Sequence, residues 1–203
     1  MKEISTASKT STAASRAFAA LALVAISLPA AAHPGHDLAS GFVAAALHPL
    51  TGADHLLATL CAGMLAVHLG GRAGRAMPWV CLAGMLGGAA FGAAGWVGSP
   101  MEVLLGASVA ALAAMLLVPA ALGRGLVVLV AAGFAAVHGH AHRVESGMPL
   151  VSAEMAGLLF TSAALMLAGA VGWRQLMRLG LRGAHVALPM ASAGLFLTVR
   201  ALT

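Results

Sequence analysis

Long apolar segments, separated by short polar or glycine-rich breaks, dominate the chain after residue 37. A helix that crosses a bilayer needs about 20 predominantly apolar residues, so this pattern predicts a helical protein with several membrane passes. The apolar segments cover residues 38–70, 77–98, 101–122, 126–138, 150–173 and 185–202. We interpret them as six passes of an all-α bundle, a polytopic membrane protein with a single transmembrane domain over residues 33–203. The fourth segment reaches full length only if it extends from Arg124 through the histidines that follow it.

The first apolar segment is too long for one pass and too short for two. It is interrupted by the polar stretch HPLTGADH, residues 48–55. A proline disfavours helical backbone at the residue before it, so Pro49 biases His48 away from the helical region. The sequence therefore predicts a first pass that is broken or re-entrant, with the break at His48-Pro49.

The N-terminal 32 residues have a different pattern. Lys2, Lys9 and Arg16 precede a short apolar stretch, residues 17–28, which is followed by Pro-Ala-Ala-Ala. A basic region, a short apolar region and small residues at a cleavage site are typical of a secretory signal peptide. We expect residues 1–32 to be removed and the mature chain to begin outside the membrane; an uncleaved first helix is the alternative.

The arginines predict the orientation of the bundle. With the mature N-terminus outside, six arginines fall on the inner side: Arg72, Arg75, Arg124, Arg174, Arg178 and Arg182. Only Arg143 and Arg200 fall outside. Because basic residues accumulate in cytoplasmic loops, the sequence predicts a multi-pass protein of the bacterial inner membrane with a periplasmic mature N-terminus.

Composition narrows the function class. The chain is 61% hydrophobic and only 8% charged, which excludes a water-soluble enzyme. The net charge of +5 does not indicate nucleic-acid binding, because the arginines lie between apolar segments and do not cluster with aromatic residues. Cys61 and Cys81 lie within apolar segments without metal-binding spacing, so we interpret them as packing residues.

Ionisable residues at membrane depth are costly, so each is a candidate functional residue. The first group is His48, Asp54 and His55. With Pro49 and Gly52 opening the backbone, these three side chains are expected to turn toward one point. Two imidazoles and a carboxylate are suitable ligands for a first-row divalent cation. A hydrogen-bonded contact between helices is the alternative interpretation.

The second group is His138, His142 and Glu145, at the outer end of the fourth pass. On a continuous helix these residues lie at i, i+4 and i+7, on one face, where they can chelate a metal ion. A solvated histidine-rich loop is the alternative, and His140 points elsewhere. Because both groups fall in the outer half of the membrane, we expect them to form one site.

Further acidic and histidine residues lie at the same level. Glu102, at the start of the third pass, is a candidate fourth contributor, although a carboxylate at a helix N-terminus is also stabilised by the helix dipole. His36 and Asp37 form a candidate metal-collecting arm, with a mobile tail as the alternative. We predict metal binding by His48, Asp54, His55, His138, His142, Glu145, Glu102, His36 and Asp37.

Two motifs give the chain a family resemblance. HPLTGADH at residues 48–55 and VHGHAHRVE at residues 137–145 resemble the H-x5-D-H and F-H-G-x-A-H-G-x-E motifs of the HupE/UreJ family of membrane proteins. The resemblance covers the mature chain and implies a nickel permease associated with hydrogenase and urease. Two residues depart from the pattern: Val137 replaces an aromatic residue and Arg143 replaces a glycine. Arg143 places a cation beside His142, which would lower metal affinity.

The expected function is a permease for nickel(II), with cobalt(II) as a competing substrate, that supplies hydrogenase or urease maturation. No G-x-x-x-x-G-K-[ST] loop is present, so transport would not depend on ATP. The expected partners are a divalent metal ion, the lipid bilayer and a metalloenzyme maturation protein; no cofactor other than the transported ion is expected. Two other classes stay open: a metal-binding accessory or sensor protein, and a membrane-embedded metalloenzyme.

Overall fold

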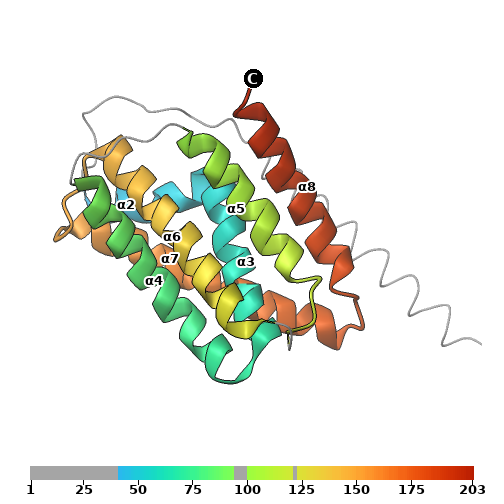
Figure 1. The fold of residues 1–203 in the computed structure, drawn as a ribbon. Coiled ribbons are helices and arrows are strands. Elements are labelled where there is room, and N and C mark those ends of the chain that lie inside the picture. The colour runs from blue at the N-terminus through green and yellow to red at the C-terminus, as the bar shows by residue number, and fades with distance from the viewer. Residues whose placement is uncertain (1–40, 94–99, 121–122) are drawn as a thin grey trace, which may run out of the picture.

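The computed structural model describes residues 41–93, 100–120 and 123–203, and the regular structure in these ranges is helical (Figure 1). The helices are α2 (Phe42–Thr51), α3 (Ala53–Leu69), α4 (Gly71–Ala93), α5 (Met101–Met115), α6 (Arg124–Ser146), α7 (Ala153–Arg178) and α8 (Ala184–Arg200). Helix α3 lies in the middle of the bundle and contacts each of the other described helices. The predicted all-α fold is confirmed, whereas the predicted signal peptide, residues 1–32, lies outside the described residues.

Helix length separates the described helices into two groups. By length and composition α4, α6 and α7 can cross a membrane, and the bent pair α2–α3 adds a fourth candidate span if it is counted as one. Helices α5 and α8 are apolar but shorter, with 15 and 17 residues. As expected, α6 extends from Arg124 through the histidines. Large apolar side chains such as Phe160, Leu167 and Leu195 lie exposed on the outside of the bundle, as in proteins surrounded by lipid.

The first element is broken, as predicted, but the position of the break differs from the prediction. Helix α2 continues through His48 and Pro49, and the chain bends by 86° at Gly52, which has extended backbone angles. Pro49 lies near the end of α2, where its ring keeps a helical φ and its missing N–H costs a single hydrogen bond, to the carbonyl of Ala45. The prediction of a break at His48-Pro49 is therefore wrong by a few residues, because proline is tolerated in this last turn.

Glycines allow the helices to approach closely. A Cβ atom at Gly88 of α4 would lie 2.6 Å from the carbonyl carbon of Ala136, and one at Gly139 of α6 would lie 2.6 Å from that of Met85. Glycines occupy similar close approaches between α3 and α7 and between α5 and α8. In a membrane, where burial of apolar surface does not drive helix association, such contacts between small residues supply the packing.

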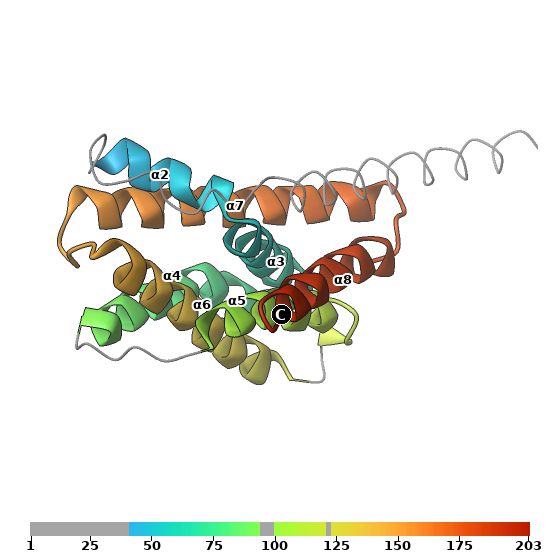
Figure 2. The same ribbon diagram turned by 90° about the horizontal axis from the view of Figure 1, so that it is seen from above.

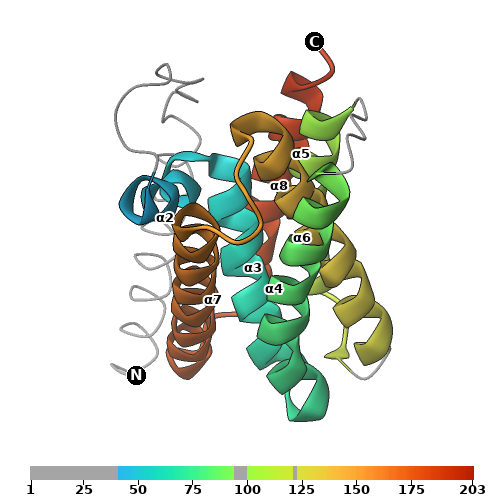
Figure 3. The same ribbon diagram turned by 90° about the vertical axis from the view of Figure 1, so that its left-hand side faces the viewer.

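The same contacts establish the relative directions of the helices. Helices α4 and α6 are parallel, because residues later in α4 contact residues later in α6. Helices α3 and α7 are antiparallel, as are α5 and α8. A sharp turn at Gly70 reverses the chain between α3 and α4. As a result, the helices from α3 to α8 alternate in direction, and α2 packs beside α7 across one end of the bundle (Figures 2 and 3).

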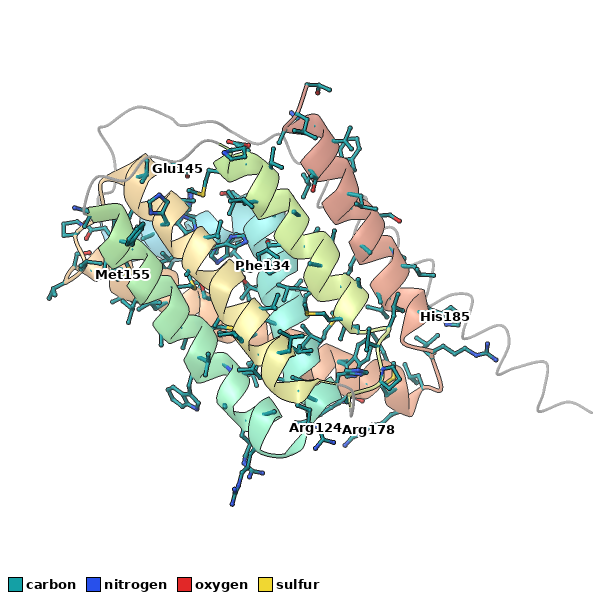
Figure 4. All side chains as sticks on the ribbon, in the orientation of Figure 1. Arg124, Phe134, Glu145, Met155, Arg178 and His185 are labelled. Carbon is teal, nitrogen blue, oxygen red and sulfur yellow. The ribbon has the colours of Figure 1, made fainter. Side chains whose placement is uncertain are left out.

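The two ends of the bundle differ in charge. At one end, which we call the site end, α3, α5 and α7 begin, and the acidic residues of the described ranges lie there: Asp54, Glu102, Glu145 and Glu154. At the opposite end, which we call the arginine end, are Arg72, Arg75, Arg124, Arg174, Arg178 and Arg182. Figure 4 shows Glu145 far from Arg124 and Arg178.

Candidate metal site

Side chains from α2 and α6 meet at the site end. His48, His142 and Glu145 each offer one ligand atom, and these atoms lie within 4.8 Å of one another. The rings of His48 and His142 meet edge to face, with centroids 4.9 Å apart. His142 is buried whereas His48 and Glu145 are exposed, so this group, which we call the outer triad, opens toward the site end. Two imidazoles and a carboxylate can bind a first-row divalent ion.

Two features of the sequence bring the outer triad together. His142 and Glu145 are three residues apart on α6, and residues at this spacing share a helix face. His48 reaches them because the bend at Gly52 turns α2 across the bundle. Gly157 of α7 allows this arrangement, since a Cβ atom there would lie 3.1 Å from the backbone nitrogen of Ala46 in α2.

Further histidines continue from the outer triad into the bundle. The Nε2 atom of His142 lies 2.8 Å from Nδ1 of His55, and the rings of His55 and His138 meet edge to face at 5.3 Å between centroids. His55, His138 and His142 are buried. His48, His142, His55 and His138 thus form a histidine column that connects both sequence motifs.

Two serines that the sequence analysis did not single out border this column. The Oγ atom of Ser162 on α7 lies 3.0 Å from Nε2 of His55, and that of Ser108 on α5 lies 2.9 Å from Nε2 of His138. Both serines are fully buried. A serine inside an apolar helix usually bonds to its own backbone, so its type and spacing give no signal of a role at a site.

A cavity lies beside the inner part of the column. Its volume is about 350 Å³, including the open space at its mouth, and its polar lining comes from His55, Thr59, His138 and Ser162. Sulfur-containing side chains, Cys81 and Met85, also line it. The inner end of the histidine column therefore borders a space that combines nitrogen, oxygen and sulfur atoms.

The other predicted ligands lie apart from the outer triad. Asp54 is partly buried at the start of α3, where its Oδ1 atom accepts a hydrogen bond of 2.8 Å from the backbone N–H of His55. Glu102 is exposed at the start of α5 and, within the described ranges, belongs to no close group of potential ligands. His36 and Asp37 lie outside the described residues. His48, His142 and Glu145 thus converge, with His55 and His138 behind them, and the Asp54 carboxylate interacts electrostatically with His138.

The side chain of Arg143 bonds to the end of its own helix. Its guanidinium donates hydrogen bonds to the backbone carbonyls of Gly147 and Met148. Gly147 has a left-handed φ of 66° and ends α6. The charged group of Arg143 is therefore bonded to carbonyl groups beyond the helix end, a common position for arginine at a helix C-terminus.

Comparison with known proteins relates the chain to one family. A family model described as HupE / UreJ protein matches residues 21–200, a range that contains all the described helices. Protein HupE of Rhizobium leguminosarum bv. viciae is 32% identical over 149 residues, which cover 72% of this chain and 78% of that protein. No solved structure matches the chain. The chain belongs to the HupE/UreJ family.

Proposed function

We propose that this protein is an ATP-independent permease that imports nickel(II) across the bacterial inner membrane and supplies it to hydrogenase or urease maturation. Cobalt(II) is a competing substrate. The observation that carries the proposal is the outer triad, in which ligand atoms from α2 and α6 lie within 4.8 Å of one another. Imidazole and carboxylate ligands suit these ions, and a triad without thiolate binds weakly enough for a transported ion to leave.

The proposed topology has six passes, α3 to α8, with α2 as a re-entrant helix at the periplasmic face. The alternating directions of these helices support it, as does the accumulation of arginines at one end, which is then cytoplasmic. Helix α5 has 15 residues and is about 22 Å long, against about 30 Å for the hydrocarbon core. Such a short helix is accommodated by local thinning of the bilayer.

The proposed path begins at the outer triad, which is open to the periplasm because His48 and Glu145 are exposed. The ion then passes beside the histidine column to the cavity that His138 and Ser162 line. Beyond the cavity, buried apolar side chains, including Leu65, Leu69 and Leu116, fill the bundle toward the arginine end. Release to the cytoplasm therefore requires these side chains to separate after the ion has entered.

The proposal is tested with the purified protein in liposomes and radioactive nickel outside. Wild-type protein is expected to accumulate nickel that an external chelator does not remove. Glu145→Gln should lower accumulation strongly, because it removes the charged ligand without changing the shape of the side chain. Glu102→Gln is the matched control, an exposed acid at the same end of the bundle but outside the triad, and should accumulate nickel normally.

The same measurement separates the other two classes. A metal-binding accessory or sensor protein would bind nickel that the chelator then removes completely. A metalloenzyme would likewise show no accumulation inside the liposomes. Either result with wild-type protein, or normal accumulation by Glu145→Gln, would contradict the permease mechanism.

A further inference from the structure

We infer that Ser162 is a positioning residue for the outer triad, which acts through His55 to hold His142 in the tautomer that binds the transported ion. The inference rests on the proposed function and adds to it a residue outside both sequence motifs. It connects three helices, because Ser162 lies on α7, His55 on α3 and His142 on α6.

The first step is the direction of the bond between Ser162 and His55. The Oγ atom of Ser162 lies 2.8 Å from the carbonyl oxygen of Leu158, one turn earlier on α7. A carbonyl oxygen carries no proton, so two oxygens at this distance require that the hydroxyl proton lies between them. Since the hydroxyl has a single proton, it cannot also donate to His55. The Nε2 atom of His55, 3.0 Å away, must therefore carry the proton and donate it to Ser162.

The second step follows from the chemistry of neutral imidazole, in which one ring nitrogen carries a proton and the other a lone pair. With its proton on Nε2, His55 has the lone pair on Nδ1. The Nε2 atom of His142 lies 2.8 Å from this Nδ1 and must donate to it. His142 then keeps its lone pair on Nδ1, which is therefore the ring nitrogen that can bind a metal ion.

The consequence concerns both motif histidines. His55 uses both ring nitrogens in hydrogen bonds, to Ser162 and to His142, so in this arrangement it orients a ligand instead of being one. A histidine that binds a metal commonly donates its other N–H to such a partner, and loss of the partner typically costs 10- to 100-fold in metal affinity. Ser162 sets the direction of both hydrogen bonds, because its own proton is already donated to the carbonyl oxygen of Leu158.

Ser108 provides a matched control within the same bundle. It is fully buried, donates to the carbonyl oxygen of Leu105 at 2.6 Å, and lies 2.9 Å from Nε2 of His138. Its hydrogen bond is therefore of the same kind, but it ends at His138, which is not a member of the outer triad. Removal of either hydroxyl should affect folding similarly, whereas only Ser162 should affect the tautomer of His142.

The experiment uses the full chain and combines transport with nitrogen NMR. In wild-type protein labelled with 15N at histidine, the signals that disappear in His142→Ala should have the shifts of an imidazole protonated at Nε2. Ser162→Ala should lower the population of this tautomer and raise the KM for nickel by up to about 10-fold, the lower end of the cost of losing a ligand's direct partner, with a smaller change in maximal rate. Ser108→Ala should keep the tautomer of His142, and its KM should change much less than that of Ser162→Ala, because Ser108 bonds to His138 and not to the outer triad.

Three results would overturn the inference: a proton on Nδ1 of His142 in the wild-type protein, a wild-type KM in Ser162→Ala, or an equal loss in Ser108→Ala. The NMR measurement of the wild type needs no metal and uses His142→Ala only to assign the signals, so it decides the inference even if Ser162→Ala does not fold. Absence of nickel accumulation by wild-type protein, together with the expected tautomer, would instead overturn the proposed function and leave the bonding of Ser162, His55 and His142 as described.

Discussion

Gly139 lies between two histidines of α6, at one of the points where this helix closely approaches the backbone of α4. A Cβ atom at Gly139 would lie 2.6 Å from the carbonyl carbon of Met85 and 2.7 Å from its Cα. Non-bonded carbon atoms prefer separations of about 3.5–4.0 Å. Gly139→Ala therefore forces the two helices apart by about 1 Å at this point.

This displacement is large compared with the geometry of the site. His142 lies three residues after Gly139, and its hydrogen bond to His55 is 2.8 Å long. A shift of about 1 Å in α6 would stretch this bond beyond the roughly 3.2 Å limit of a normal hydrogen bond. Misplacement of reacting groups by 1 Å can cost about 100-fold, and overpacking typically lowers stability by about 1–3 kcal/mol.

The assay compares Gly139→Ala with Gly133→Ala on the same helix, where a new Cβ meets nothing within 4 Å. In liposomes, Gly139→Ala should lower nickel uptake by at least about tenfold, and its unfolding temperature should fall. Gly133→Ala should change neither, since its methyl group has open space. If the two variants behave alike, close contact between α4 and α6 is not what places the histidines.

Three other predictions concern different parts of the account. Arg143→Ala should lower the unfolding free energy by about 1 kcal/mol through loss of its bonds to the carbonyls of Gly147 and Met148, while the affinity for nickel stays close to wild type; a large loss of affinity would show that Arg143 belongs to the site. The orientation is tested in a background without native cysteines, Cys61→Ala and Cys81→Ala. Val151 is 97% exposed at the site end, so Val151→Cys should react with an impermeant thiol reagent added to intact spheroplasts. A cysteine at Leu179, 68% exposed at the arginine end, should react only after lysis, and the reverse result would invert the proposed orientation. His185→Ala, at an exposed position at the arginine end, should leave nickel binding to the outer triad unchanged, as measured by titration of the detergent-solubilised protein, and weaker binding would indicate a second site there.

Much of the fold could be predicted from the sequence because lipid imposes strong constraints on the chain. Each of the later apolar segments corresponds to a described helix, and α6 includes the histidines as expected. The break in the first segment could also be expected, but its place could not. Proline disrupts a helix more strongly than glycine, yet Pro49 lies near the end of α2, where it costs little helix stability. The chain instead leaves the helix at Gly52, which takes the extended conformation.

The candidate site was predictable only in part. The helical spacing of His142 and Glu145 places them together, and the same spacing puts His138 one turn deeper, next to the cavity. Asp54 was expected to face the same point; its Oδ1 atom accepts the backbone N–H of His55, as a carboxylate at a helix start can, and its charge interacts with His138 of the histidine column. The contribution of Ser162 depends on contact between helices distant in sequence, which spacing within one segment cannot predict.

The most direct test of the central claim is X-ray absorption spectroscopy of the nickel-loaded protein, because it counts the imidazoles bound to the ion. The account predicts two imidazoles and oxygen ligands in the wild type, since His48 on α2 and His142 on α6 are both ligands. It also predicts one imidazole in His48→Ala and one in His142→Ala. An unchanged spectrum in either variant, or sulfur ligands in the wild type, would contradict a nickel site formed where these two distant segments meet.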